Sequence, residues 1–561
     1  MTILGISSFY HDSAAALIKD GKILCAVEEE RFSRIKHDNS FPLLAIEECL
    51  KSQGLTIEDV DYITYYEKPL LRFERILDNM VLTFPWSFRL FMRALPEWIG
   101  NKIKVEYLIK KETGYKGKIL FVPHHLSHAA LGFFTSPFKE AGILTIDGVG
   151  EYQTTALWIS RDSLIEPLKE INFPHSIGLL YSTFTAFLGF RVNEGEYKMM
   201  GLAAFGTPRY ENEIKKIIDI KDDGSFKLDM SYFGFNYRDR MWSNKFKVLF
   251  GEPRMEGEEI EKRHEDLAAS IQMVVEEIYF KMVNHLKDIT KLNNVVISGG
   301  VGLNSLANGK IFESTGFPNV HIYGSAGDSG GAIGSALYIS HFLSEERVVS
   351  NAPSLRLGNR YSNKEIKKIV SAFNIKVEEK REEELIEFVA KKLKDGNVLG
   401  WFEGKMEFGP RALGGRSIIA SPIGKEMKDR VNFIKNREKF RPFAGSVLEE
   451  KVDDLFEAPL GIKSWPFMNF CFQSKKERRN DIMAIVHEDG TSRVQTVSPE
   501  DGRYYRLIKK FDELTGVPCV LNTSFNVAGQ PIVESPEQAI EAFLKSDIDY
   551  LVLENFLLFK E

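Results

Sequence analysis

Two stretches of this 561-residue chain repeat one pattern, and this repeat constrains the fold more than any other feature. The segment ILGISSFYHDSAAALIKDGKILCAVEEE (3–30) predicts a strand, a polar turn, a second strand, a tight turn and a third strand. The segment ILTIDGVGEYQTTALWISRDSLIEPLKE (143–170) predicts the same series of elements. Two copies are too few for a solenoid, so we expect a duplicated α/β domain.

Helical and strand patterns continue to alternate along the rest of the chain. An amphipathic helix is predicted over 264–289, a buried strand over 294–300 and a helix over 329–343. Further helices and the strands VLGWFEG, CVLNTSF and YLVLENFLLF follow the polar segment 344–365. Because a chain of this length exceeds one hydrophobic core, we predict two α/β domains, 1–350 and 351–561.

Composition excludes several classes of protein. The formal charge is 73 − 79 = −6, which favours neither a nucleic-acid surface nor a polybasic membrane anchor. The four cysteines lack C-x-x-C spacing, so neither a disulfide framework nor a cysteine zinc site is predicted. No signal peptide or apolar run of about 18 residues is present, so we expect a cytoplasmic protein. The segment 81–100 predicts a helical insert with an aromatic face, either packed internally or contacting an acceptor or a subunit.

The segment VPHHLSHAALGFF places His124 and His128 four residues apart at the start of a predicted helix. Their imidazoles would lie one turn apart on one face, a spacing that suits two ligands of one metal ion. Hydrogen-bonded or surface histidines are the alternative, and His125 points off that face. Asp147 ends an apolar strand, and Asp328 lies in a glycine turn that opens onto a helix. We therefore consider both carboxylates as further ligands.

Three turns rich in glycine follow predicted strands: TIDGVGE (145–151), SGGVGLN (298–304) and YGSAGDSGGAIG (323–334). Such turns expose backbone N–H groups, which favour phosphate at a helix N-terminus. None matches G-x-x-x-x-G-K-[ST], and the acid of a dinucleotide-binding fold is absent downstream. Three turns on a duplicated frame nevertheless favour a nucleotide site.

The second half contains basic side chains among glycines and aromatic residues. Two arginines occur in EFGPRALGGRS (407–417), and NFIKNREKFRPFAG (432–445) alternates four basic residues that an extended chain would place on one face. A solvated edge strand is the alternative. Arginine forks bind phosphate in a bidentate manner, and lysine adds a point charge. HEDGTSRVQTV adds Arg493, and VLNTSFNVAGQPIV adds Asn522, Ser524 and Asn526 on a turn after a buried strand. With Arg411, Arg416, Lys435 and Arg441 from the two basic stretches, these groups favour an anion pocket in the second half.

These motifs carry a resemblance to known families. The hairpins with GIS…HDSA, TIDGVGE and SGGVGLN resemble the actin/sugar-kinase/heat-shock (ASKHA) ATPase frame, and HHLSH resembles its metal-dependent branch that makes threonylcarbamoyladenosine in tRNA. With EGEYKMMGLAAFG, HEDLAASIQ, EFGPRALGGRSIIASP, KNREKFRPFA, DGTSRVQTV and NTSFN, essentially the whole chain resembles the O-carbamoyltransferase family of NodU/CmcH type. That family decorates antibiotics and nodulation signals. The second half accordingly resembles YrdC-like domains; GGRS and IIASP depart from the Asn and Asp that family members often carry.

The resemblance implies a two-site reaction. The second domain would bind carbamoyl phosphate and release carbamate, and the first would join carbamate to ATP as carbamoyl adenylate and transfer the carbamoyl group to a hydroxyl. The metal ligands would be His124, His128, Asp147 and Asp328, holding Fe²⁺ or alternatively Zn²⁺ or Mn²⁺, with Mg²⁺ accompanying the nucleotide. The ATP-binding residues would be Asp12, Asp147, Gly148, Gly150, Lys198, Gly299, Gly300, Asn304, Gly327 and Asp328.

Catalytic roles follow from the same resemblance. Lys435 and Arg441 would act on carbamoyl phosphate, and Arg411 and Arg416 would form or brace that pocket. His11 would accept the proton of the acceptor hydroxyl, since a neutral imidazole can do so near pH 7; a hydrogen bond that braces its turn is the alternative. Lys198 either contacts the nucleotide or pairs with a nearby glutamate.

Three rival functions remain at this point: a threonylcarbamoyl transferase acting on tRNA, a silent nucleotide-binding scaffold and a sugar kinase. The charge of −6 disfavours tRNA, which is bound largely through phosphate neutralisation. The paired histidines and the basic cluster disfavour a scaffold, and a kinase leaves the second half without a role. We expect a small hydroxylated acceptor such as a natural product or sugar, contacted by the inserts 66–115 and 207–262, and a homodimer by default.

Overall fold

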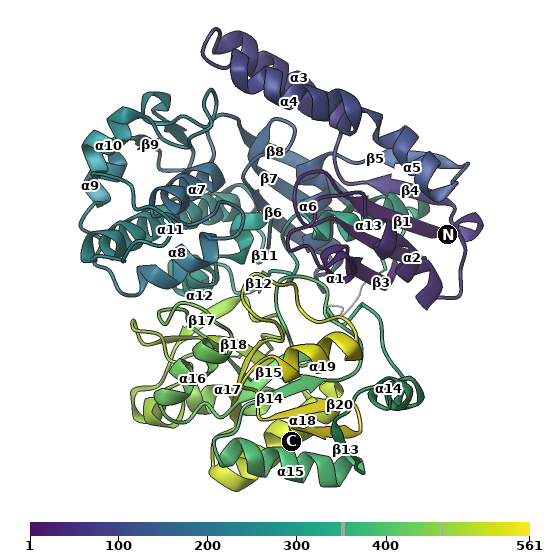
Figure 1. Ribbon diagram of the computed structural model, residues 1–561. Helices are drawn as coiled ribbons and strands as arrows, with labels where there is room; N and C mark the ends of the chain where they lie inside the picture. The colour runs from purple at the N-terminus through teal and green to yellow at the C-terminus, as the bar shows by residue number, and fades with distance from the viewer. Residues whose placement is uncertain (349–353, 460, 463, 561) are drawn as a thin grey trace. The chain divides into compact units, whose positions relative to one another are not determined.

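The computed structural model describes residues 1–348, 354–459, 461–462 and 464–560. The chain forms two compact units (Figure 1). Unit 1 comprises Met1–Ala26 with Asn39–Pro353, and unit 2 comprises Val27–Asp38 with Ser354–Glu561. The short segment 27–38 therefore belongs to unit 2 although it lies near the N-terminus of the chain.

Unit 1 contains two five-stranded sheets in its described residues. The first has the order β3-β2-β1-β4-β5, with strands β1 (Thr2–Ser7), β2 (Ala14–Lys19), β3 (Lys22–Glu28), β4 (Tyr62–Tyr65) and β5 (Lys118–Phe121). The second has the order β12-β11-β6-β7-β8, with strands β6 (Glu140–Ile146), β7 (Gln153–Arg161), β8 (Leu164–Asn172), β11 (Asn294–Ser298) and β12 (Asn319–His321).

The two sheets have the same topology. In each, the first strand pairs antiparallel with the second and parallel with the fourth (β1 with β2 and β4, β6 with β7 and β11). The duplication predicted from 3–30 and 143–170 is thus confirmed, and with it the ASKHA-type frame.

Two helices lie between these sheets, α6 (His124–Phe134) and α13 (Gly330–Ser344). Glycine permits their close approach: a Cβ on Gly5 of β1 would lie 1.9 Å from the carbonyl oxygen of Ala332. A Cβ on Gly334 would lie 2.0 Å from the carbonyl oxygen of Ser127. Any larger residue at either position would force the helices apart.

Other helices surround this frame. The predicted helix at 264–289 is confirmed as α11 (Lys262–Thr290), whose buried face packs on α8 (Glu196–Ala203), α9 (Glu211–Lys215) and β6. Helices α7 (Ile177–Phe187), α10 (Asn244–Phe250) and α12 (Ser305–Ser314) and the hairpin β9 (Ile218–Ile220) and β10 (Phe226–Leu228) complete this part. The insert after β4 holds α3 (Pro69–Leu82), α4 (Phe88–Gly100) and α5 (Val105–Thr113), so the predicted single insert at 81–100 spans two helices. No helix in the described part of the chain is long and apolar enough to cross a bilayer.

Unit 2 is built on a nine-stranded mixed sheet in its described residues, in the order β13-β21-β20-β14-β15-β19-β16-β18-β17. The strands are β13 (Lys376–Glu379), β14 (Leu399–Phe402), β15 (Arg416–Ala420), β16 (Ala444–Leu448), β17 (Phe470–Gln473), β18 (Thr491–Val497), β19 (Cys519–Ser524), β20 (Tyr550–Leu553) and β21 (Phe556–Phe559). The α-helices in its described residues are α1 (Glu30–Ser33), α14 (Asn363–Val370), α15 (Glu382–Lys394), α16 (Glu426–Ile434), α17 (Val452–Leu455), α18 (Arg503–Thr515) and α19 (Pro536–Leu544). The α/β class predicted for the second half is confirmed.

YLVLENFLLF forms strand as predicted, divided into the hairpin of β20 and β21, because Glu554 has a left-handed φ of 49° that reverses the chain. The prediction of an extended segment at 435–441 was wrong: Lys435 caps α16, and Asn436 has a φ of 48°. Its four basic residues therefore do not share one strand face.

Candidate functional site

Four predicted metal ligands lie together in unit 1. His124 and His128 come from the first two turns of α6, Asp147 follows β6, and Asp328 precedes α13. Their nearest ligand atoms all lie within 4.8 Å of one another. The Nε2 atoms of His124 and His128 are 2.9 Å and 3.1 Å from Oδ2 of Asp147, and 3.6 Å and 3.5 Å from Oδ1 of Asp328.

This donor set fits a divalent transition-metal ion. Two imidazole nitrogens and two carboxylates are ligands that Fe²⁺, Zn²⁺ and Mn²⁺ accept, whereas Mg²⁺ prefers oxygen alone. Asp328 is buried, and its Oδ2 has no hydrogen-bond partner among the described residues. Two carboxylates buried so close together need a positive charge between them, so the residues present suit a bound cation.

The pKa values reflect the same crowding of charge. Burial lowers the pKa of His128, but hydrogen bonds to Asp147 and Asp328 outweigh burial and raise it to about 9. Although burial opposes it, the two histidines hold the pKa of Asp147 well below its usual range. His125 behaves differently: burial and the neighbouring histidines keep its pKa well below 6.5, and its Nδ1 contacts Thr145 Oγ1 at 2.8 Å. His125 is therefore a neutral core residue, as its position off the face predicts.

His11 and Asp12 follow β1 and reach the same place. His11 Nδ1 lies 2.9 Å from Oδ2 of Asp12, and its Nε2 lies 3.8 Å from Oδ2 of Asp328. Burial lowers the pKa of His11, but Asp328 and Asp12 raise it to about 9. With these carboxylates uncompensated, His11 is protonated at pH 7, which is the wrong state for a general base. A cation beside Asp328 would shift His11 toward its neutral form.

The predicted glycine turns converge beside this cluster, because β1, β6, β11 and β12 all end there. The N–H of Gly299 donates to the carbonyl of Ala326 at 3.0 Å, which ties the turn after β11 to the turn that holds Gly327 and Asp328. Gly299 has a φ of +93°, and a Cβ there would lie 2.2 Å from the carbonyl oxygen of Ile146. A Cβ on Gly300 would lie 2.9 Å from Oδ1 of Asp147, whose same oxygen accepts the N–H of Gly148.

The remaining predicted nucleotide-binding residues include Gly150, Asn304 and Lys198. A Cβ on Gly150 would lie within 3.1 Å of both His124 and His125, so this turn lies against the histidines. Asn304 caps α12 through the N–H of Ala307 and binds Gln272, so its amide is engaged in structure. Lys198 lies half-buried in α8.

Sequence reasoning missed one residue that holds the histidine pair. The carboxylate of Glu151 accepts the backbone N–H of His124 at 3.0 Å and that of Lys68 at 2.7 Å. It thereby satisfies an unpaired N–H at the start of α6 and fixes the entry to α3. Its position in TIDGVGE, four residues after Asp147, was the available signal.

A second group beside the cluster was also missed. Arg72 and Arg75 are buried one turn apart on α3; Arg72 pairs with the buried Glu67 and lies 4.5 Å from the Tyr10 ring centroid. Burial and, to a smaller extent, Arg72 lower the pKa of Arg75 to about 10. Buried arginines on an insert carry no motif, so sequence alone gave no sign of them.

In unit 2, Lys435 is the most constrained of the predicted anion-binding residues. Its buried ammonium donates to Ser524, to the carbonyl of Asn526 at 2.9 Å and to Oδ1 of Asn526 at 2.8 Å. All these acceptors are neutral, and Lys435 forms no ion pair with a described residue. Burial, then Arg437 and Arg441, lower its pKa well below the ordinary value.

The sheet register places further predicted residues at the same level. Ala444 of β16 is paired with Asn522 of β19 on one side and with Arg493 of β18 on the other. Asn522 Nδ2 donates to Ala412 O at 3.1 Å, so the glycine-rich loop that carries Arg411 passes next to it. Arg441 stands three residues before β16. The structure thus gathers Lys435, Arg493, Asn522 and Ser524 near one end of the sheet.

The side chain of Arg416 is surrounded by backbone carbonyls and an aromatic ring. It is fully buried, lies 3.5 Å from the Phe402 ring centroid and donates to the carbonyls of Gly404 and Gly415 at 3.1 Å and 3.0 Å. Glu407 was missed by sequence reasoning; its carboxylate accepts the N–H groups of Leu413 and Gly415 at 2.7 Å and 2.6 Å. Of the two roles predicted for Arg416, this geometry corresponds to bracing.

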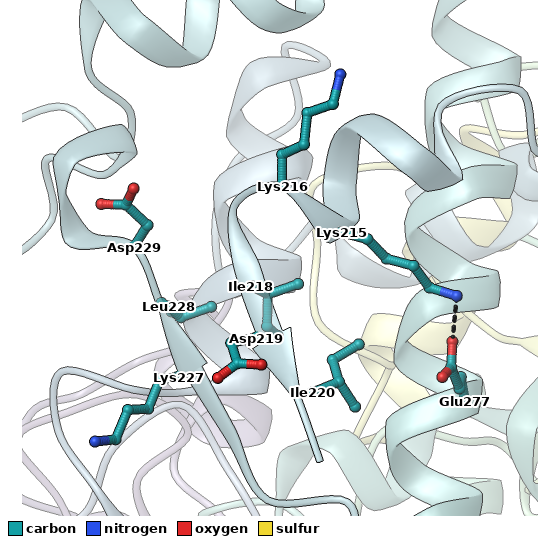
Figure 2. Close-up of a pocket in the computed structure, with 9 residues that line it drawn as sticks. All are labelled: Lys215, Lys216, Ile218, Asp219, Ile220, Lys227, Leu228, Asp229 and Glu277. Atoms are coloured by element: carbon teal, nitrogen blue, oxygen red, sulfur yellow. Dashed lines mark ion pairs between the residues drawn. The ribbon is translucent and has the colours of Figure 1, made fainter. Parts of the chain in front are cut away.

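A hollow of about 530 Å³ lies elsewhere on unit 1, between α9, the β9–β10 hairpin and α11 (Figure 2). Lys215 pairs there with Glu277 at 2.9 Å. Figure 2 shows the charged ends of Lys216 and Lys227 pointing away from each other at its rim. None of the predicted site residues lines it, and its charges compensate one another, so we assign it no role.

In comparison with known proteins, two family models match two successive parts of the chain. The model of the family described as "Carbamoyltransferase N-terminus" matches residues 2–337, and that described as "Carbamoyltransferase C-terminus" matches residues 390–560. The chain belongs to the carbamoyltransferase family. The predicted enzyme class is thereby confirmed, as is the resemblance to the O-carbamoyltransferase family.

Curated relatives extend over nearly the whole chain. The uncharacterized protein sll1178 of Synechocystis is 45% identical and covers 100% of this chain and 96% of its own. Nodulation protein NolNO of Sinorhizobium fredii is 36% identical, covering 99% of this chain and 80% of its own. Among solved structures, HypF of T. kodakarensis is 13% identical, covering 61% of this chain and 48% of its own with a TM-score of 0.32.

Proposed function

We propose that this carbamoyltransferase uses carbamoyl phosphate and ATP to carbamoylate a hydroxyl of a small molecule through a carbamoyl adenylate. One observation carries the proposal: the two family domains follow each other along the chain, and each unit gathers one of the two required sets of residues. Unit 1 has the His–Asp cluster among glycine turns. Unit 2 has the buried lysine with neutral partners.

Unit 2 would bind carbamoyl phosphate. The ammonium of Lys435 has neutral oxygens around it, and a phosphate would supply the missing negative charge. Arg441 and Arg493 would add charge, and Arg411 would add a guanidinium from the glycine-rich loop. Water would then cleave the bond between the carbamoyl group and phosphate, which yields carbamate, inorganic phosphate and a proton.

Unit 1 would bind ATP at the glycine turns, where backbone N–H groups can receive phosphate oxygens. Carbamate oxygen would attack the α-phosphorus, and pyrophosphate would leave. A divalent ion held by His124, His128, Asp147 and Asp328 would neutralise phosphate charge when bound. The acceptor hydroxyl would then attack the carbamoyl carbon, and AMP would leave while His11 takes the hydroxyl proton.

The role of His11 requires its neutral form. Asp12 and Asp328 hold its proton in the metal-free arrangement. His11 would therefore become a proton acceptor only when positive charge near Asp328 compensates the carboxylates. This coupling would restrict hydroxyl activation to the loaded site. The acceptor class we propose is a hydroxylated natural product or sugar.

The proposal is tested by following AMP, pyrophosphate and phosphate in purified protein with ATP and a divalent metal, with and without carbamoyl phosphate. Lys435→Met should raise the KM for carbamoyl phosphate at least about 30-fold, because a buried charge partner is lost, and leave the KM for ATP unchanged. Lys439→Met is the matched control, since Lys439 is an exposed lysine on the same segment. Production of ADP, or release of AMP at the same rate with and without carbamoyl phosphate, would refute the proposal.

A further inference from the structure

The helical hairpin of α3 and α4 ends in a group of exposed apolar side chains. The hairpin extends away from the sheets of unit 1 (Figure 1). At its turn, Leu82 is 84% exposed, Trp86 71% and Phe84 62%. Val81 and Phe88 are exposed as well. We call Val81, Leu82, Phe84, Trp86 and Phe88 the apolar tip.

The hairpin itself is well anchored, so the exposure at its tip is not due to fraying. Phe73 of α3 packs on Trp98 of α4, with ring centroids 5.7 Å apart. Asn79 donates to the carbonyl of Asn236 at 2.6 Å. At the start of α3, Lys68 N–H is held by Glu151, the same carboxylate that caps the histidine helix. A rigid support thus presents five apolar side chains to solvent, which costs free energy unless something covers them.

The charge around the tip is opposite to that of the chain. No Asp or Glu occurs between Asp78 and Glu97, whereas Arg89 and Arg93 do, and the whole chain carries −6. Arg93 is paired with Asp239, with Nη1 to Oδ2 at 2.8 Å. Arg89 is exposed and forms no ion pair with a described residue. Because Asp239 neutralises Arg93, the exposed Arg89 gives the surroundings of the apolar tip a net positive charge, which complements an anionic surface.

The size and composition of the tip favour a bilayer over a second copy of the chain. Its five side chains expose roughly 500 Å² together, which is less than the ~800 Å² per partner of a stable protein interface. A second copy would also bring the same arginines together. Tryptophan prefers the boundary between lipid headgroups and acyl chains, and tryptophan, phenylalanine and leucine form the apolar face of helices that lie in that boundary. A basic residue near an anionic leaflet contributes about 1 kcal/mol.

We infer that the apolar tip is a membrane-docking element that inserts its aromatic side chains into the headgroup boundary of anionic lipid, with Arg89 at the lipid phosphates. The element does not span the bilayer; it holds the protein at the surface. If the proposed function also holds, an enzyme docked in this way reaches hydroxylated acceptors that are themselves anchored in the membrane. The docking itself does not depend on carbamoyl transfer.

The test uses the full-length protein with phosphatidylcholine vesicles, with and without phosphatidylglycerol. We expect sedimentation with the anionic vesicles and weak or no sedimentation with the neutral ones. Trp86 is the one exposed tryptophan of the six. Its emission should therefore shift to shorter wavelength and be quenched by brominated lipid, while the buried tryptophans remain unquenched.

Variants distinguish vesicle binding through the apolar tip from nonspecific binding of exposed apolar side chains. Leu82→Ser with Phe84→Ser should weaken vesicle binding by at least about tenfold, because two apolar side chains no longer enter the lipid. Phe342→Ser is the matched control, since Phe342 is an equally exposed aromatic residue outside the hairpin. Arg89→Glu should abolish the preference for phosphatidylglycerol. All are exposed positions, so thermal unfolding midpoints should remain at the wild-type value.

Two results would overturn the inference. One is equal binding of wild type and the Leu82→Ser, Phe84→Ser variant to anionic vesicles. The other is a wild-type protein that does not bind vesicles and is a dimer by light scattering, while the Leu82→Ser, Phe84→Ser variant is a monomer. That second result would assign the tip to a protein interface instead.

Discussion

The metal cluster predicts that a divalent ion binds more tightly as the pH rises from 7 to 9. In the metal-free arrangement, Asp147 and Asp328 raise the pKa of His128 to about 9 although burial opposes this. A metal ligand must be deprotonated, so binding has to displace that proton. The perturbation is therefore pH alone, applied to the intact protein.

The magnitude follows from the pKa. A group of pKa about 9 is almost fully protonated at pH 7 and half protonated at pH 9, so binding should be about 50-fold weaker at pH 7 than at pH 9, or about 2 kcal/mol. The same shift acts on folding of the metal-free protein. Because the pKa of folded His128 is raised from 6.5, its stabilising contribution is complete below pH 6.5 and is lost as the pH rises through 9. That contribution is about 3 kcal/mol.

The assay is a titration with Mn²⁺ against a competing chelator, with direct calorimetry in two buffers of different ionisation enthalpy. At pH 7 the calorimetry should report release of about one proton or more for each ion bound. In parallel, urea unfolding of the metal-free protein should lose stability between pH 6.5 and 9, and His128→Ala should flatten that profile. An Mn²⁺ affinity that is the same at pH 7 and 9, with no proton released, would refute the reasoning.

Three further changes have defined outcomes. Glu151→Ala leaves the backbone N–H groups of His124 and Lys68 without their acceptor, so the free energy of unfolding measured in urea should fall by about 3 kcal/mol. An unchanged free energy of unfolding would show that water replaces the carboxylate. Arg416→Met removes the hydrogen bonds to buried carbonyls and the contact with Phe402, so it should lower the midpoint of thermal unfolding. The protein that still folds should keep the wild-type KM for carbamoyl phosphate. A selective rise in that KM would instead place Arg416 in the pocket. Gly299→Ala puts a Cβ 2.2 Å from a carbonyl at positive φ, so ATP binding measured by calorimetry should weaken at least tenfold, and wild-type binding would contradict a role for this turn.

Much of unit 1 was predictable because its signals are local and repeated. The duplicated strand pattern predicted the antiparallel part of both sheets, β1–β3 and β6–β8, since consecutive strands joined by short turns pair with each other. The His124–His128 spacing put two imidazoles on one helix face. That Asp147 and Asp328 join them follows from where strands β6 and β12 end, and the glycine turns marked those ends.

Other features depend on contacts between distant parts of the chain. The alternation of basic residues at 435–441 predicted an extended segment, but a left-handed Asn436 after α16 breaks it, and periodicity does not report φ. In the sequence, Arg416 cannot be distinguished from an arginine that binds phosphate. Only its burial against Phe402 favours a bracing role over a phosphate-binding one. Arg72 and Arg75 come near the metal cluster because the residue before α3, Lys68, is hydrogen-bonded to Glu151, which also holds the start of α6; no short motif encodes this contact.

The central claim is that carbamate is joined to ATP before any acceptor is involved. Exchange of labelled pyrophosphate into ATP tests this most directly, with carbamoyl phosphate and a divalent metal present and no acceptor added. The account predicts exchange that requires carbamoyl phosphate and is lost in both Lys435→Met and His128→Ala. Absence of exchange in wild-type protein that still binds ATP and carbamoyl phosphate, or exchange without carbamoyl phosphate, would contradict it.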